Sequence, residues 1–182
     1  MRRDVVFNMI VAVDEEFGFG KDGKIPWNFK RDFQWFRENT NGEPCIMGRR
    51  TYEDLLEMRR STLDEDGTTN PLPNRQIFVL TSNPENIEIH GDTKAYNTLD
   101  GVKKYLLKEN PYSDRVEAFL CGGRRIYEDN MSSIDKVFVT IIEGNYECDR
   151  KLDLINLTKG KSIIHGEKNV EDGKVLTFLI YK

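Results

Sequence analysis

Cysteine and histidine are scarce in this chain. Its 182 residues include three cysteines and two histidines. Cys45, Cys121 and Cys148 are odd in number and widely spaced, so they make neither a disulfide framework nor a metal-ligand pattern. His90 and His165 have no cysteine or histidine at ligand spacing, and we interpret both as surface or structural residues. We therefore expect no metal site and a reducing, cytoplasmic setting.

Long apolar runs and a strong excess of one charge are also missing. No run approaches the roughly 18 residues that a membrane-spanning helix needs. Residues 1–4 lead into a short strand-like run without a small-residue cleavage site, so no signal peptide is expected. The formal net charge of -4 gives no reason to expect a nucleic-acid partner. We find no internal repeats and no low-complexity segments.

The composition that is present is typical of a globular protein with a well-charged surface. Hydrophobic residues make up 38% of the chain and charged residues 32%. At this length the simplest organisation is one domain over residues 1–182, large enough for a substantial core.

Residues 26–40 carry the most distinctive pattern. They are predicted to form a helix with Asn28 as the N-cap and with residues 40–42 as its end. At about 100° per residue, Phe29, Phe33 and Phe36 share one stripe, with Trp35 at its edge. We expect Phe29 and Trp35 to belong to the core.

Asp32 lies inside this aromatic stripe, one turn from Phe29 and from Phe36. A carboxylate there must find a partner or keep its proton at a raised pKa, which makes Asp32 a candidate general acid. The alternative is a half-exposed surface acid or one paired with a nearby arginine. The residues alone favour this plainer interpretation, because structural ion pairs also perturb carboxylates.

Strand-like and helix-like segments alternate early in the chain and strands pair late. Strands are predicted over residues 5–13, 44–47, 76–80, 94–96, 116–121, 137–142, 162–168 and 175–181, and helices over 51–58, 99–109 and from 122 onward. Residues 57–74 are polar and proline-containing, which indicates a loop insertion. The pattern indicates an α/β three-layer sandwich with a central mixed, mostly parallel sheet flanked by helices.

Three glycine-containing segments are candidates for binding or for loops. Residues 18–23 read G-x-G-x-x-G, but no helix opens on the last glycine, so we reject a Rossmann fingerprint and expect a flexible loop. Residues 48–51 (GRRT) at a helix start could hold a phosphate or be a basic surface turn. The pair Gly122-Gly123 between a strand and a helix could approach a pyrophosphate, although such a pair is more often only a turn.

Together these motifs resemble the dihydrofolate reductase family over nearly the whole chain. The segments that carry the resemblance are residues 8–13 (NMIVAV), 18–27 (GFGKDGKIPW), 32–36 (DFQWF), 46–52 (IMGRRTY), 72–75 (LPNR), 122–127 (GGRRIY) and 139–140 (VT). Each is weak alone, but their order and spacing are specific. The resemblance implies reduction of 7,8-dihydrofolate to tetrahydrofolate with NADPH, in support of thymidylate and one-carbon metabolism.

The resemblance also implies the roles of the substrate-site residues. Asp32 would bind the amino-pyrimidine edge of the pterin and promote protonation at N5, Thr140 would hydrogen-bond its carboxylate, and Trp27 would order water near it. Arg75 would bind the α-carboxylate of the glutamate tail, a task that suits the guanidinium fork. The remaining substrate contacts would come from Ile10, Val11, Ile25, Phe33, Phe36, Leu55, Leu72, Cys121 and Tyr127.

The NADPH contacts implied by the resemblance come from several segments. They are Ala12, Gly20, Lys21, Gly48, Arg49, Arg50, Thr51, Leu80, Thr81, Ser82, Cys121, Gly122, Gly123, Arg124, Arg125 and Ile126. Arg49, Ser82 and Arg125 would recognise the adenosine 2′-phosphate, so NADPH should be preferred over NADH. The family joins the glycine pair by a cis peptide, which we expect here at Gly122-Gly123.

Three departures from the family pattern affect these assignments. Cys121 replaces the usual aliphatic residue beside the pterin, and its smaller, polarisable side chain would loosen the pocket and alter antifolate binding. Arg124 replaces a residue that is more often small and adds positive charge near the phosphates. The longer segment between Leu55 and Arg75 could reshape the entrance for the glutamate tail.

Two other functions stay open at this point. One is a reductase of the same fold acting on a riboflavin-pathway pyrimidine, which needs neither Asp32 nor Arg75. The other is a non-catalytic protein that binds folate or nucleotide, against which Asp32, Trp27 and Thr140 argue. We expect antifolate inhibitors as further ligands, a monomer, and association with thymidylate synthase as an open question.

Overall fold

The apolar N-terminal run forms a long strand, β1 (Asp4–Asp14), as its composition predicts. In the computed structural model, which describes residues 3–182, most side chains of this strand are buried. Burial without strict alternation is typical of a strand covered on both faces.

The chain divides into two compact units. Unit 1 runs through Phe7 and continues over Thr40–Ser133, and unit 2 comprises Asn8–Asn39 and Ile134–Lys182. The boundary falls inside β1, so this strand contributes residues to both units.

Unit 1 contains parallel strands with helices between them. Its strands are β3 (Cys45–Gly48), β4 (Ile77–Leu80), β5 (Thr93–Tyr96) and β6 (Arg115–Leu120), and its helices are α2 (Arg49–Arg59), α3 (Leu99–Glu109) and α4 (Arg124–Asp129). Short 3-10 turns are η1 (Arg60–Thr62), η2 (Pro84–Asn86) and η3 (Met131–Ser133). β3 pairs in parallel with β4 and with β6, and β4 pairs in parallel with β5. Parallel neighbours need a crossover connection, and the connection between β3 and β4 contains α2.

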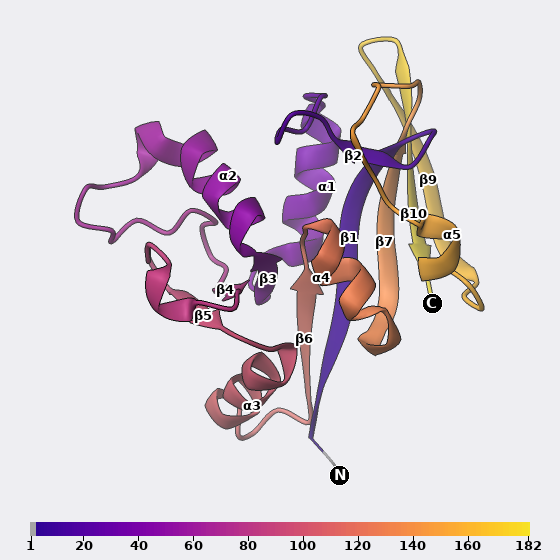
Figure 1. Cartoon of the computed structure of the whole chain (residues 1–182). Coiled ribbons are helices and arrows are strands. Elements are labelled where there is room, and N and C mark those ends of the chain that lie inside the picture. The colour runs from indigo at the N-terminus through magenta and orange to yellow at the C-terminus, as the bar shows by residue number, and fades with distance from the viewer. Residues whose placement is uncertain (1–2) are drawn as a thin grey trace. The chain divides into compact units, whose positions relative to one another are not determined.

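Unit 2 carries the helix with Asp32 and the antiparallel strands. Its elements are β2 (Gly18–Gly20), α1 (Lys30–Thr40, whose last residue falls in unit 1), β7 (Ile134–Ile142), β8 (Arg150–Lys151), α5 (Leu154–Leu157), β9 (Ile163–Glu171) and β10 (Lys174–Tyr181). β10 pairs antiparallel with β7 on one side and with β9 on the other. β9 and β10 form the yellow hairpin at the C-terminal end of the chain (Figure 1).

Backbone hydrogen bonds order the eight main strands as β5-β4-β3-β6-β1-β7-β10-β9, while β2 and β8 form a separate two-stranded sheet. The expected α/β class with a central mixed, mostly parallel sheet and accompanying helices is confirmed. Among the described residues, no helix has the length and apolar character needed to cross a membrane.

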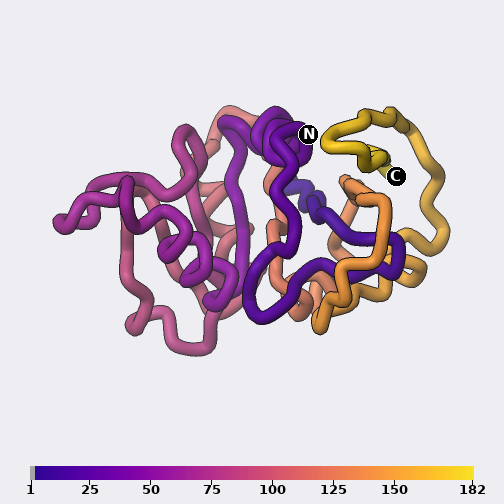
Figure 2. Tube along the Cα trace, turned by 90° about the horizontal axis from the view of Figure 1, so that it is seen from above, coloured from indigo at the N-terminus to yellow at the C-terminus, as the bar shows by residue number. Residues whose placement is uncertain are grey.

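The structure corrects two of the expected segment boundaries. α2 runs from Arg49 to Arg59, so it starts two residues before the predicted helix and takes residues 57–59 from the predicted 57–74 loop. The remaining loop after η1 extends away from the strands of unit 1 in both views (Figures 1 and 2). The segment 18–23 is not only a loop, because Gly18–Gly20 forms β2 and pairs with β8.

The predicted N-cap of α1 is wrong. The helix begins at Lys30, and its first turn is closed by the N–H of Phe33, which donates to the Phe29 carbonyl at 3.3 Å. Phe29 therefore occupies the N-cap position, and Asn28 lies outside the helix. A phenylalanine has no oxygen with which to cap, so the free N–H groups need an acceptor from elsewhere.

Aromatic side chains hold α1 against the C-terminal hairpin. Phe178 of β10 is fully buried, and its ring lies 5.0 Å from the Trp35 ring, centroid to centroid. The Arg31 guanidinium lies over the same Phe178 ring at 5.0 Å. Phe29 and Trp35 are both buried, as expected for core residues.

We expect Phe178→Ala to lower the free energy of unfolding by about 3–5 kcal/mol, because it removes a buried ring and leaves a cavity under α1. Ile163→Ala on the same hairpin is the matched control, since Ile163 is 56% exposed and should cost less than about 0.5 kcal/mol. Urea denaturation of both variants measures the difference. Equal losses for the two variants would contradict the packing that we describe.

Candidate active site

Asp32 lies in the first turn of α1 and is half-buried. The pKa of its carboxyl group is raised from an ordinary 3.8 to about 6, and desolvation by the surrounding protein is the largest cause. Hydrogen bonding by Thr140 and Trp27 acts to lower this pKa, and the negative charge of Glu171 acts to raise it. The carboxyl group is therefore half-protonated at about pH 6 and keeps a proton in about a tenth of the molecules at pH 7, far more than an ordinary aspartate, which suits a general acid.

Thr140 and Trp27, both in unit 2, are the side chains that the structure brings to Asp32. Thr140 is buried on β7, and its hydroxyl is the stronger of the two hydrogen-bonding influences on the carboxylate. Trp27 is buried, and its ring meets the Tyr146 ring edge to face at 5.2 Å. The Trp27 Nε1 has no partner of good hydrogen-bond geometry among residues 3–182, so it acts on Asp32 as a nearby dipole.

Asp14, a second acid in unit 2, has a lowered pKa, whereas the pKa of Asp32 is raised. Burial acts to raise the pKa of Asp14, but backbone N–H groups of Tyr146, Gly18 and Glu16 donate to the carboxylate and bring the pKa below its ordinary value. The distances from these nitrogens to the Asp14 oxygens are 3.0, 2.8 and 3.0 Å. Asp14 is thus a charged anchor for the segment that leads into β2, and Asp32 is the acid that takes up a proton at about pH 6.

The acceptor for the start of α1 comes from the far end of the chain. Glu171 of β9 accepts a hydrogen bond from the backbone N–H of Lys30 at 2.8 Å and from that of Arg31 at 3.0 Å. The sequence pattern gave no sign of this contact, because the partners are 140 and 141 residues apart.

Two helices of unit 1 begin on glycine without a capping side chain. Gly48 is the N-cap of α2 and Gly123 is the N-cap of α4, and neither start has a side-chain cap. By contrast, Thr98 caps α3 and Asp153 caps α5. Uncapped N–H groups at a helix start favour an anion such as a phosphate.

The same two helix starts lie side by side. The Gly48 N–H donates to the Gly122 carbonyl at 2.8 Å, and the peptide between Gly122 and Gly123 is cis, as expected. A Cβ on Gly123 would lie 3.3 Å from the Thr51 hydroxyl oxygen, and one on Gly48 would lie 3.3 Å from Ile126 Cγ1. Glycines therefore keep these helix starts close together. Arg49, Arg50, Arg124 and Arg125 are exposed beside them, with Arg49 paired to Glu53 at 2.6 Å and Arg124 to Glu128 at 2.8 Å.

Other predicted cofactor residues lie elsewhere. In unit 1, Leu80 ends β4, and Thr81 and Ser82 follow it, with the Thr81 N–H donating to the Tyr96 carbonyl at 3.0 Å. In unit 2, Ala12 lies on β1, Gly20 ends β2, and the Lys21 ammonium is 3.2 Å from Glu147.

Cys121 follows β6 and is flanked by Cys45 and Tyr127. Burial is the largest cause of its raised pKa, and Cys45 raises it further, while Arg75 acts in the opposite direction. Burial likewise raises the pKa of Tyr127, with Cys121 contributing. Both groups are therefore neutral at physiological pH.

Arg75 is buried rather than free at the surface. Its Nε donates to the Pro73 carbonyl at 3.0 Å, and its NH1 donates to the Thr40 hydroxyl at 3.2 Å. These contacts fix the plane of the guanidinium, which an arginine binding a carboxylate through two bonds requires.

The apolar residues that are predicted to contact the substrate differ in exposure. Ile10 is buried and Ile25, Phe33 and Phe36 are more exposed in unit 2, with Ile25 at 53% and Phe33 at 40%. Val11 is intermediate, whereas Leu55 and Leu72 of unit 1 are buried. Exposed aromatic and aliphatic side chains near a carboxylate are typical of an apolar binding surface.

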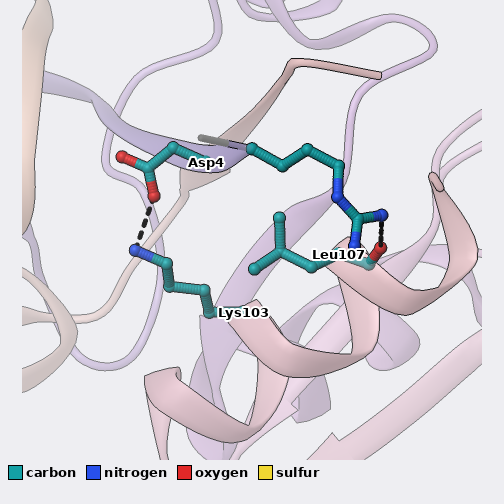
Figure 3. A pocket seen from close by; sticks show the side chains of 4 residues that line it. Asp4, Lys103 and Leu107 are labelled. Atoms are coloured by element: carbon teal, nitrogen blue, oxygen red, sulfur yellow. Dashed lines mark hydrogen bonds and ion pairs between the residues drawn. The ribbon is translucent and has the colours of Figure 1, made fainter. Parts of the chain in front are cut away.

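A shallow pocket of unit 1 contains none of the predicted site residues. It is lined by Arg3, Asp4, Lys103 and Leu107 (Figure 3). The Lys103 ammonium is 2.6 Å from Asp4, and the Arg3 NH1 donates to the Leu107 carbonyl at 3.2 Å. The polar groups of this pocket are therefore paired with groups of the protein itself. Among the described residues there is also no cluster of histidine, cysteine and acidic side chains suited to a metal ion.

Comparison with known proteins decides the family. The family model described as dihydrofolate reductase matches residues 6–182. The chain belongs to the dihydrofolate reductase family. The dihydrofolate reductase of Bacillus subtilis is 29% identical over 93% of this chain and 88% of its own. The bifunctional dihydrofolate reductase-thymidylate synthase of Daucus carota is 32% identical over 82% of this chain and 28% of its own.

A solved structure supports the same fold. Dihydrofolate reductase from Enterococcus faecalis, complexed with NADP(H), matches with a TM-score of 0.75 and 23% identity. The match covers 100% of this chain and 98% of that one. The arrangement of strands in this dihydrofolate reductase family member is therefore the family's own.

The raised pKa of Asp32 makes this residue costly for stability above pH 6. Its pKa is 3.8 in an ordinary setting and about 6 in the fold, so the folded chain binds the proton more tightly. The free energy of unfolding should therefore fall as the pH rises from about 4 to about 6, and stay lower above that.

We expect Asp32→Asn to be more stable than the wild type by about 2–3 kcal/mol at about pH 7.5, and no more stable at about pH 4. Denaturant unfolding at both pH values measures this. A variant that is less stable than the wild type at the higher pH would contradict the desolvation that we describe.

Proposed function

We propose that this chain is an NADPH-dependent dihydrofolate reductase that converts 7,8-dihydrofolate to 5,6,7,8-tetrahydrofolate. The observation that carries the proposal is the raised pKa of the Asp32 carboxyl group, which Thr140 and Trp27 influence through hydrogen bonding. Family membership over residues 6–182 supports it. A single domain over residues 1–182 is part of this proposal.

Asp32 has two tasks in the proposed reaction. Its carboxyl group binds the amino-pyrimidine edge of the pterin, and its raised pKa promotes protonation at N5 near neutral pH. Thr140 orients the carboxyl group through its hydroxyl, and the Trp27 N–H is free to hold a water beside it. Ile10, Val11, Ile25, Phe33, Phe36, Leu55, Leu72, Cys121 and Tyr127 exclude water from the rings, and Arg75 binds the glutamate tail.

NADPH, when bound, supplies the hydride that C6 receives. The residues fit such a group, because Gly48 and Gly123 start two uncapped helices and the arginines beside them are exposed. Thr51, Gly122, Arg124 and Ile126 complete the proposed phosphate contacts. Arg49, Ser82 and Arg125 recognise the 2′-phosphate. Ala12, Gly20, Lys21, Leu80 and Thr81 contact the rest of the cofactor.

The reaction itself is the first test. Purified protein mixed with dihydrofolate and NADPH should consume NADPH, and the Asp32→Asn variant should lose at least about a hundredfold in rate at neutral pH. The wild-type rate should fall above pH 6 as Asp32 loses its proton. A variant as active as the wild type would reject Asp32 as the central residue. A wild type that binds NADPH and an antifolate without turnover would instead support a non-catalytic binding protein.

Cofactor choice is a separate prediction. Arg125→Gln should raise the KM for NADPH by about tenfold or more, because a charge-assisted hydrogen bond to the 2′-phosphate is lost, and should leave the KM for NADH within about twofold. Lys104→Gln on α3 removes the same charge and should change neither value. Equal catalytic efficiency of the wild type with NADPH and NADH would overturn the assignment.

We further propose a cytoplasmic monomer that antifolates inhibit. Association with thymidylate synthase is suggested by the relatives from Daucus carota and Glycine max, which are described as bifunctional dihydrofolate reductase-thymidylate synthases. Sedimentation of the purified chain, alone and with a separate thymidylate synthase, tests the oligomeric state and the association.

A further inference from the structure

A carboxylate from the C-terminal hairpin closes the start of the Asp32 helix. The two oxygens of Glu171 accept from two successive backbone N–H groups, those of Lys30 at 2.8 Å and Arg31 at 3.0 Å. Arg31 is the residue directly before Asp32. Because Phe29 at the N-cap has no side-chain oxygen, Glu171 does the work of a capping residue from 140 positions away.

The turn of the hairpin holds Glu171 in place. Glu171 is the last residue of β9 and pairs with Lys174, the first residue of β10. Asp172 and Gly173 between them have φ values of 51° and 74°, which are the two positive values of a tight two-residue hairpin turn. The position of Glu171 is therefore set by the strand register and by the turn that follows it.

A second acid of β9 holds the side chain of the same helical residue. Glu167 accepts from Arg31 NH2 at 2.6 Å, and Arg31 NH1 also reaches Glu38 at 3.2 Å. Residues 167 and 171 are four positions apart on one strand and so share a face. The two acids thus fix Arg31 by its side chain and by its backbone.

We propose that Glu171 is a positioning residue for Asp32, because its carboxylate fixes the first turn of α1 and with it the place of the Asp32 side chain. The catalytic meaning of this inference rests on the proposed reductase function. The contact itself does not.

The negative charge of Glu171 also acts on the carboxyl group of Asp32. It adds to desolvation in raising the pKa of Asp32. The other charged groups near this end of α1 are Lys30, which helps to lower the pKa of Glu171, and Arg31, which is paired with Glu38 and Glu167. On β9, His165 stacks on Trp35 and lies 3.6 Å from Glu167. β7 presents Thr140, and the Asp14 charge at the end of β1 is held by backbone N–H groups.

The test compares Glu171→Gln with Asp172→Asn. Both substitutions remove one negative charge from the same turn, but only the first alters a ligand of the helix start. Asparagine tolerates the positive φ of position 172, so the control keeps the turn. Two measurements are made on each protein: the Asp32 carboxyl titration by carbon-13 NMR, and the pH profile of dihydrofolate reduction.

Glu171→Gln should lower the pKa of Asp32 by about 0.5 and reduce the rate above neutral pH about threefold, with the KM for dihydrofolate nearly unchanged. The amides of Lys30 and Arg31 should exchange with solvent faster than in the wild type. Asp172→Asn should leave the titration, the profile and the exchange near wild-type values.

Equal effects of the two substitutions, or none from Glu171→Gln, would overturn the proposal. The proposed function can fail separately. If the wild type does not reduce dihydrofolate, the activity is rejected, while the Asp32 titration and the amide exchange still decide whether Glu171 positions Asp32.

Discussion

The site depends on one constraint: hydrogen bonding does not fully compensate the carboxylate of Asp32 for its desolvation. Asp14 and Asp32 are both acids with burial acting against their charge, yet their pKa values move in opposite directions. Asp14 gains three backbone N–H donors, whereas Asp32 has a hydroxyl, an indole and a neighbouring negative charge. Hydrogen bonding therefore decides which of the two pKa values is lowered and which is raised.

The helix starts also fall into two groups, those with a side-chain acceptor and those without one. Thr98, Asp153 and Glu171 complete the starts of α3, α5 and α1, and these ends are structural. α2 and α4 start on glycine and have no side-chain cap. Two adjacent helix starts of this kind are suited to a bound anion, because the positive end of each helix dipole lies there.

Local patterns predicted most of the fold. The limits of α3 match the predicted 99–109 helix, and the strands β3 to β7 appear close to their predicted ranges, because apolar periodicity reflects burial directly. Two predictions, the N-cap of α1 at Asn28 and the loop at Gly18, were wrong for a different reason. The start of α1 is hydrogen-bonded by Glu171 and the Gly18 segment pairs with β8, and both partners come from distant parts of the chain. The aromatic stripe singled out Asp32 and the family resemblance gave Thr140 and Trp27 as its partners, but only the fold adds Glu171. Roles of single residues toward ligands came from the family resemblance and not from periodicity.

The tight turn at Asp172-Gly173 has a consequence for how this chain can change in length. An added residue before the turn would shift Glu171 by about 3.4 Å along β9 and send its side chain to the opposite face of the hairpin. The start of α1 would then lose its acceptor although no residue of α1 had changed. The loop that follows η1 has no such register with a helix start. Insertions and deletions should therefore accumulate after η1 in natural variants, and the hairpin tip should keep its number of residues.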